Sequence, residues 1–99
     1  MRRRLILSAP LALAACGAAV LDPVEAQRRA RVEVAVKAAY PGILDEIARG
    51  GGPDLLAAFN AAGVPVGDRA ARVTQMQSDL GLYGGSPGAL VAALVAFGA

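Results

Sequence analysis

Residues 41–63 read PGILDEIARGGGPDLLAAFNAAG, and proline and glycine bracket two apolar segments within this stretch. Pro41 and Pro53 stand where a helix tolerates proline, in its first turn, while Gly50 and Gly63 stand where helices commonly end. The stretch therefore predicts two short helices joined by a tight glycine turn. Their buried positions are expected to be Ile43, Leu44, Ile47, Leu55, Leu56 and Phe59.

The same punctuation continues towards the carboxyl end of the sequence. Asp68 is the expected N-cap of a helix that runs to about Leu80, and Gly81 is expected to stop it. Ser86, followed by proline, is the expected N-cap of a last helix that runs through Phe97. Apolar residues also occur in the connections, namely Val64, Val66, Leu82 and Tyr83. We expect the two valines to pack beneath their loop.

Residues 27–40 carry the one ambiguous pattern. Residues 31–37, RVEVAVK, alternate polar and apolar side chains as a strand would. In a helix, Val32 and Val36 would instead share one apolar stripe with residues 39–40. The helix is favoured, because no second β-rich run follows that could pair with a strand.

Helices this short are not stable alone in water, so they must bury their apolar stripes against one another. We predict an all-α fold, a small bundle of about five short helices formed by residues 27–99 and monomeric in solution. Its centre is expected at Leu55, Phe59, Val73, Met76, Leu90, Leu94 and Phe97.

The charge of the chain divides unevenly along the sequence. The whole chain has a net charge of +2, but three of its ten basic residues are Arg2, Arg3 and Arg4. From residue 16 onward, seven basic and eight acidic side chains remain, a net charge of −1. The basic character therefore belongs to the first residues, and the rest shows no basic footprint for nucleic acid.

The chain contains one cysteine and no histidine. One cysteine cannot form a disulfide within the chain, and zinc or another transition metal would lack its usual Cys/His ligands. Catalytic triads that use histidine as the base are excluded as well. We therefore expect no metal, no cofactor and no enzymatic activity, since no nucleophile, base and orienting group can be assembled from these residues.

The first fifteen residues have the composition of a signal peptide. A basic segment, residues 1–4, precedes an apolar run of eleven residues, 5–15. A membrane-spanning helix needs about 20 apolar residues, so this run is too short to span in the ordinary way. It ends in Leu13-Ala14-Ala15-Cys16, which is followed by Gly17.

This ending resembles the lipobox of bacterial lipoproteins: a branched aliphatic residue, two small residues and a cysteine. The resemblance implies that a signal peptidase recognises Leu13, Ala14 and Ala15, cleaves before Cys16, and leaves Cys16 as a lipidated N-terminus. Two or three acyl chains would anchor the protein stably in a membrane. In such proteins an Asp after the cysteine retains them in the inner membrane, so Gly17 favours the outer membrane, facing the periplasm. An ordinary signal peptide with a chance cysteine is the alternative.

Residues 16–26 are expected to form a short lipidated tether, because they are rich in alanine and show no periodic apolar face. Two later motifs suggest chemistry but have simpler explanations. The run Arg49-Gly50-Gly51-Gly52-Pro53 lacks the strand and the Lys-Ser/Thr of a phosphate loop, and is expected to be a turn. The carboxylates of Asp45 and Glu46 would point about 100° apart on a helix, so they are expected to favour the helix dipole rather than act as an acid and base.

The leading hypothesis for function is a non-enzymatic, lipid-anchored module that binds another protein of the cell envelope. The alternative is a small membrane-active lipoprotein, of the lysis or stress type, that uses its apolar C-terminal segment, residues 88–99. That segment has only twelve residues and cannot span a bilayer, so it either packs in the core or lies on a membrane.

Overall fold

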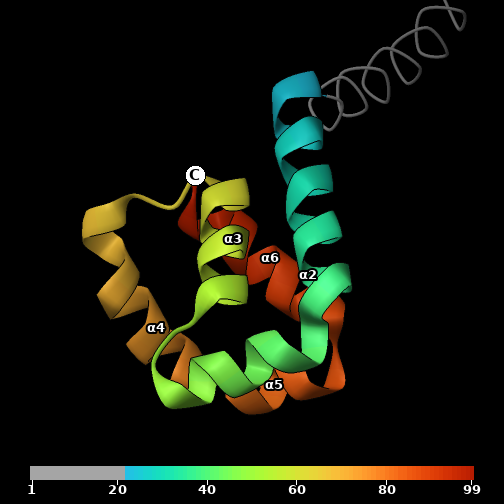
Figure 1. Cartoon of the computed structure of the whole chain (residues 1–99). Helices are drawn as coiled ribbons and strands as arrows, with labels where there is room; N and C mark the ends of the chain where they lie inside the picture. The colour runs from blue at the N-terminus through green and yellow to red at the C-terminus, as the bar shows by residue number, and fades with distance from the viewer. Residues whose placement is uncertain (1–21) are drawn as a thin grey trace, which may run out of the picture.

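The computed structural model describes residues 22–99, and within them every regular element is helical (Figure 1). With the labels of Figure 1, the elements are α2 (Pro23–Arg49), α3 (Pro53–Ala62), the 3-10 turn η1 (Val66–Asp68), α4 (Arg69–Ser78), α5 (Leu80–Gly85) and α6 (Pro87–Phe97). The predicted all-α bundle of about five helices is confirmed. The predicted signal peptide, 1–15, and the predicted lipidation site, Cys16, lie outside the described residues.

Helix α2 begins earlier than its sequence pattern predicts. It starts at Pro23 rather than at residue 27, so the last four residues of the predicted tether are helical. The cause is Asp22, whose Oδ1 accepts hydrogen bonds from the backbone nitrogens of Val24 (3.0 Å) and Glu25 (3.4 Å). An aspartate followed by proline is a strong helix start, and this signal outweighs the lack of an apolar stripe.

The two helices expected on either side of residue 40 form a single, kinked element. Ala39 has non-helical backbone angles (φ −142°, ψ 25°), and Pro41 follows inside the helix. Proline lacks the N–H for the helical hydrogen bond, and its ring clashes with the carbonyl four residues earlier. The helix therefore bends there, and its C-terminal arm crosses the base of the domain at an angle to the first arm (Figure 1).

Burial resolves the ambiguous alternation of residues 31–37 as a helix. Val32 and Val36 are fully buried, whereas Val34 between them is 68% exposed. A strand would place all three valines on one face, because its side chains repeat every second residue. The structure shows the helical period instead, and the favoured interpretation is confirmed.

The region after α4 differs from the prediction. Helix α4 ends at Ser78, and residues 80–85, expected to hold a stop and a connection, form the short helix α5. Gly81 therefore lies inside a helix instead of ending one. Tyr83 is buried, and its backbone carbonyl accepts a hydrogen bond from the hydroxyl of Tyr40 in α2. This long-range contact gives the segment the tertiary support that its glycine-rich sequence lacks.

Asp68 occupies the N-cap position of α4, as predicted, but its side chain makes no capping hydrogen bond. The residue belongs to the 3-10 turn η1, and its backbone is already helical (φ −93°, ψ −13°). A capping side chain normally extends from a residue with non-helical backbone angles. The 3-10 turn η1 therefore continues directly into α4, and no side chain caps the start of this helix.

Six of the seven residues predicted at the centre are buried, and Val73 is partly buried against them. Two other apolar residues were placed wrongly: Leu56 is 50% exposed and Val66 is 79% exposed. Helix α3 buries one narrow stripe that contains Leu55 and Phe59, and Leu56 lies about 100° away from Leu55 around the helix axis. The side of α3 that Leu56 occupies is therefore free of the core.

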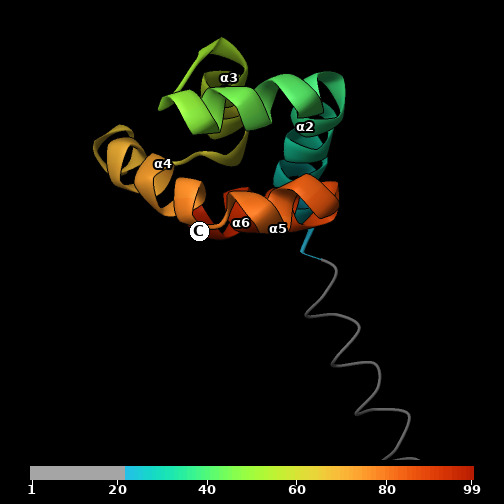
Figure 2. The ribbon, with the colours of Figure 1, turned by 90° about the horizontal axis from the view of Figure 1, so that it is seen from below.

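Helix α6 is part of the core. The hydroxyl oxygen of Ser86 accepts a hydrogen bond from the backbone nitrogen of Ala89 (3.1 Å), which confirms the predicted cap. Leu90 and Leu94 are fully buried, and the helix packs against α2, α3 and α5. Figure 2 shows the C-terminal arm of α2 on one side of the domain and α5 and α6 on the other. One face of the apolar C-terminal segment thus packs in the core, while Gly88, Ala92 and Ala96 remain exposed.

Candidate functional site

The turn between α2 and α3 is organised by Glu46, which is only 4% exposed. Its Oε1 accepts a hydrogen bond from the backbone nitrogen of Leu55 (2.8 Å), and its Oε2 accepts one from that of Asp54 (3.2 Å). These nitrogens belong to the first turn of α3, where a helix leaves its N–H groups without internal partners. Glu46 therefore supplies the negative charge and the acceptors that this helix end favours.

From the sequence, Asp45 and Glu46 were expected to act alike, as acidic residues that favour the dipole near the start of a helix. The structure separates the two, since Asp45 is exposed and only Glu46 reaches α3. The sequence contains one signal for this role of Glu46 that the prediction did not use. Gly52, at the N-cap position of α3, has no side chain that could cap the helix.

Gly52 allows the carboxylate of Glu46 to come so close. A Cβ atom at this position would overlap the Cγ and Cδ atoms of Glu46. The prediction that residues 49–53 form a turn is confirmed, and the structure adds a reason why they make no phosphate loop. The two backbone donors at the start of α3 already bind the carboxylate of the chain itself.

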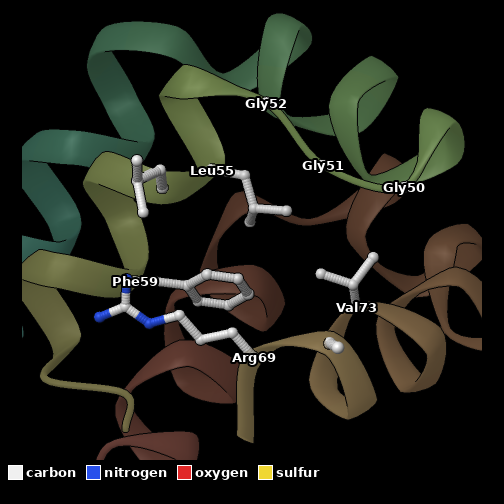
Figure 3. A pocket seen from close by; sticks show the side chains of 9 residues that line it. Gly50, Gly51, Gly52, Leu55, Phe59, Arg69 and Val73 are labelled. Carbon is white, nitrogen blue, oxygen red and sulfur yellow. The ribbon is translucent and has the colours of Figure 1, made fainter. Parts of the chain in front are cut away.

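A groove opens beside this turn, between α3 and the start of α4 (Figure 3). It has a volume of about 340 Å³ and is lined mainly by apolar side chains and glycine backbone. Its lining residues are Gly50, Gly51, Gly52, Leu55, Leu56, Phe59, Arg69, Ala70 and Val73. Ligand sites are commonly concave and mostly apolar with a few polar groups, and this groove fits that description.

Arg69 is the one charged residue that lines the groove. Its Nε and Nη2 donate to the backbone carbonyl of Val64, at 3.0 and 2.8 Å. Its guanidinium carbon lies 5.6 Å from the centre of the Phe59 ring, so the side chain lies along the aromatic wall (Figure 3). Within residues 22–99, no carboxylate lies close enough to form an ion pair with it.

Sequence reasoning did not find this groove. Leu55, Phe59 and Val73 were expected in the core, and nothing in the local pattern joins them to Arg69. The groove exists only in the folded domain, where residues of the glycine turn, of α3 and of the start of α4 come to line one space.

A second, partly buried arrangement of polar groups holds the opposite end of α3. Nη1 of Arg28, in α2, donates to the carbonyls of Ala62 and Val95, each at 2.9 Å. These carbonyls lie at the C-terminal ends of α3 and α6, which carry partial negative charge. Nη2 of Arg28 also pairs with Glu25 at 2.6 Å. Arg28 thus links α2, α3 and α6 through hydrogen bonds.

The phenol of Tyr83 is the described side chain whose acidity the fold clearly changes. Burial raises its pKa above the ordinary value, and the nearby negative charge of Asp79 raises it further. Both effects disfavour the charged phenolate. Tyr83 therefore stays protonated at neutral pH and acts as a buried structural residue.

The residues predicted to direct processing and lipidation, Leu13, Ala14, Ala15 and Cys16, lie outside the described part of the chain. Among residues 22–99 there is no group of three or more His, Cys, Asp or Glu side chains that could hold a metal ion. In the same residues, no helix combines the length and the apolar character needed to cross a membrane.

Comparison of the chain with models of protein families, with curated proteins and with solved structures gave no match. Its function is therefore inferred from its own residues and geometry.

Proposed function

We propose that this protein is a small lipoprotein of the bacterial cell envelope, anchored by acyl chains on Cys16 and facing the periplasm from the outer membrane. The order Leu13-Ala14-Ala15-Cys16, after a basic and then an apolar segment, supports the anchor. Gly17 supports the outer membrane, because the aspartate that retains such proteins in the inner membrane is missing there.

The domain that follows the anchor acts as a binding module rather than as an enzyme. The observation that carries this proposal is the groove between α3 and α4, which exposes Leu56 and Arg69 to a partner. The buried carboxylate of Glu46 and the partly buried guanidinium of Arg28 have structural partners instead of a reactive role: Glu46 binds the start of α3, and Arg28 binds the ends of α3 and α6. The groove is the surface through which we propose that the module binds another envelope component.

Processing and anchoring are tested by membrane fractionation and by the intact mass of the extracted protein. The wild type should lose residues 1–15, gain the mass of acyl chains and fractionate with the outer membrane. Cys16→Ser should remain unlipidated, whereas Ala18→Ser, a matched change two residues later, should be processed normally. Equal processing of wild type and Cys16→Ser would refute the anchor.

Binding through the groove is tested in intact cells with a photo-crosslinking amino acid placed at single positions. Leu56 and Leu82 form a matched pair, since both leucines are exposed but only Leu56 lines the groove. A discrete adduct with an envelope protein is expected from position 56 and none from position 82. Adducts with lipid alone from position 56 would contradict a protein partner and favour a membrane-active role.

A further inference from the structure

The first turns of α2 project from the domain and contribute almost nothing to its core (Figure 1). Residues 23–31 form this α2 tip, in which Arg28 is partly buried and every other residue is exposed. The first buried residue of the helix, Val32, comes directly after it. Packing within the domain therefore leaves the exposed residues of the α2 tip available to a partner.

The α2 tip lies at one end of the domain, together with the C-terminal ends of α3 and α6 and the start of α4. Nη1 of Arg28 binds the carbonyls of Ala62 and Val95, and the guanidinium carbon of Arg72 lies 4.5 Å from the centre of the Phe97 ring. This upper end of the domain in Figure 1 comprises residues 22–31, 62–72 and 95–99. The C-terminal arm of α2, the start of α3 and α5 lie at the opposite end.

The charged side chains are divided unequally between the two ends. The upper end carries five arginines and three acidic residues, a net charge of +2, whereas the rest of the described chain has a net charge of −3. Two of those three acidic residues are engaged, since Asp22 caps α2 and Glu25 pairs with Arg28. Arg29 and Arg31 are exposed and make no ion pair within residues 22–99. An anionic surface would therefore attract the upper end and repel the opposite end.

The upper end also carries the two most exposed large apolar side chains among residues 22–99. Val66 in η1 is 79% exposed, and Val24 in the α2 tip is 69% exposed. They belong to separate elements and share no groove. Exposed apolar side chains beside arginines are typical of surfaces that lie on a membrane, where the apolar groups enter the interface and the charges stay with the headgroups.

The length of chain before α2 favours lipid over protein as the partner of this end. Six residues separate Cys16 from Asp22, and an extended chain of that length spans at most about 20 Å. An anchor at Cys16 would thus keep the α2 tip close to the membrane. The attraction between arginine and anionic lipid falls off within about 8 Å, so the tether limits the distance while the charges determine the orientation.

We propose that the upper end of the domain docks on the anionic phospholipid headgroups of the membrane that holds the anchor. Arg29 and Arg31 lie about 200° apart around the helix axis, so both reach phosphate groups when the end of α2 meets the membrane, rather than one of its sides. Val24 enters the apolar edge of the headgroup layer, and Val66 rests against that layer. The acidic end then points away from the membrane. The proposal rests on the proposed function, because it needs the anchor at Cys16.

The test uses tryptophan fluorescence, since the chain contains no tryptophan of its own. Val24→Trp, Val66→Trp and the control Leu82→Trp are extracted from membranes as full-length processed proteins. They are placed in nanodiscs whose lipid headgroups carry a nitroxide quencher, made of phosphatidylcholine alone or of an equal mixture with phosphatidylglycerol. Quenching at positions 24 and 66 should be at least about twofold stronger in the mixture, and the difference should shrink at high salt. Position 82, equally exposed but in α5 at the opposite end, should show no such difference.

Two matched double variants identify the charges responsible. In the Val66→Trp protein, Arg29→Gln together with Arg31→Gln should remove most of the increase caused by phosphatidylglycerol. Lys37→Gln together with Arg49→Gln removes the same charge from exposed positions outside the upper end, and should leave the increase unchanged. Circular dichroism shows whether each variant is folded.

Equal quenching at position 66 in the two lipid compositions overturns the proposal, as does equal quenching at positions 66 and 82. These two comparisons involve no change of charge, so they decide the matter even if a double variant fails to fold. Equal effects of the two double variants would also overturn it. If the protein carries acyl chains but shows no dependence on lipid charge, this proposal falls and the proposed anchor stands. If docking is observed but position 56 gives no protein adduct, the binding module falls and the docking stands. If the intact mass shows no acyl chain, the anchor and the docking fall together.

Discussion

Glu46 and Leu55 are joined across the turn between α2 and α3 by a hydrogen bond of 2.8 Å, from the backbone nitrogen of Leu55 to Oε1 of Glu46. The bond lets a side chain at the end of one helix cap the start of the next. It also holds the glycine turn that forms one edge of the groove. The stability of the domain and the shape of its candidate site therefore depend on the same carboxylate.

Replacement of Glu46 by alanine should lower the free energy of unfolding by about 3 kcal/mol, because two hydrogen bonds to a charged acceptor are lost and buried donors remain unpaired. Urea unfolding followed by circular dichroism measures the change. Asp45→Ala, at the exposed neighbouring position, should change stability by less than about 0.5 kcal/mol. Equal effects of the two changes would show that Glu46 does not cap α3.

Gly52→Ala should destabilise the domain by about 1 to 3 kcal/mol, because the added Cβ overlaps the side chain of Glu46. In a Glu46→Ala background the same change should cost much less, since the obstructing side chain is absent. The coupling free energy from this double-mutant cycle is the measurement. Gly67→Ala is the control, because a Cβ there meets no atom within 4 Å. If the free-energy changes of Gly52→Ala and Glu46→Ala simply add, the predicted overlap between a Cβ at position 52 and the side chain of Glu46 is contradicted.

Arg28→Ala should lower stability by about 2 kcal/mol, because Nη1 of Arg28 bridges the carbonyls of Ala62 and Val95. Arg29→Ala, at the exposed neighbouring position in α2, should have little effect. Thermal melts of both variants make the comparison. Hydrogen exchange should also show loss of protection at the C-terminal ends of α3 and α6 in Arg28→Ala, and unchanged exchange there would argue against the bridge.

Stability should decrease in alkaline solution because of Tyr83. Its pKa is raised in the folded protein, chiefly by burial, while in the unfolded chain it is about 10. The folded state thus holds the proton more tightly, and the contribution of this difference is complete below about pH 10. The contribution is lost as pH rises through the folded pKa. Unfolding measured against pH should show this loss in the wild type and a smaller one in Tyr83→Phe, and identical profiles would contradict it.

Leu94→Ala should cost about 2 to 5 kcal/mol, because the side chain is fully buried in α6 and its removal leaves a cavity. Leu82→Ala, at a position that is 66% exposed, should be nearly neutral in thermal melts. The pair also addresses the alternative function. If Leu94→Ala melts like the wild type and leakage of lipid vesicles falls, α6 acts on membranes and the binding module is the wrong proposal.

Local signals in the sequence were sufficient to predict most helix ends. Pro53 and Gly63 bracket α3, and Ser86 starts α6, as their residue types predict. These signals succeed because capping and the conformational limits of proline act within a few residues of the chain. The alternating pattern around Val34 was also assigned correctly to a helix, because the sequence contains no second strand that could pair with it.

The prediction failed where contacts between distant segments prevail over local pattern. The helix over residues 80–85 is supported by Tyr40, more than forty residues away, and Glu46 caps a helix that begins beyond a glycine turn. Leu56 has the residue type of the core yet lies in the groove, because α3 packs against α2 and α6 through the stripe that contains Leu55 and Phe59.

The lipobox predicted at Cys16 is a property of the linear sequence, because it consists of a short run of residues in order, Leu13-Ala14-Ala15-Cys16. The all-α class and the apolar periods of the helices are likewise local, since each depends on residues within one or two turns. The kinked packing of α2, the cap from Glu46 and the groove at Arg69 arise only when the helices meet. Their geometry depends on how the helices are oriented relative to one another. That orientation is set by packing between side chains of different helices, which lie far apart in the sequence.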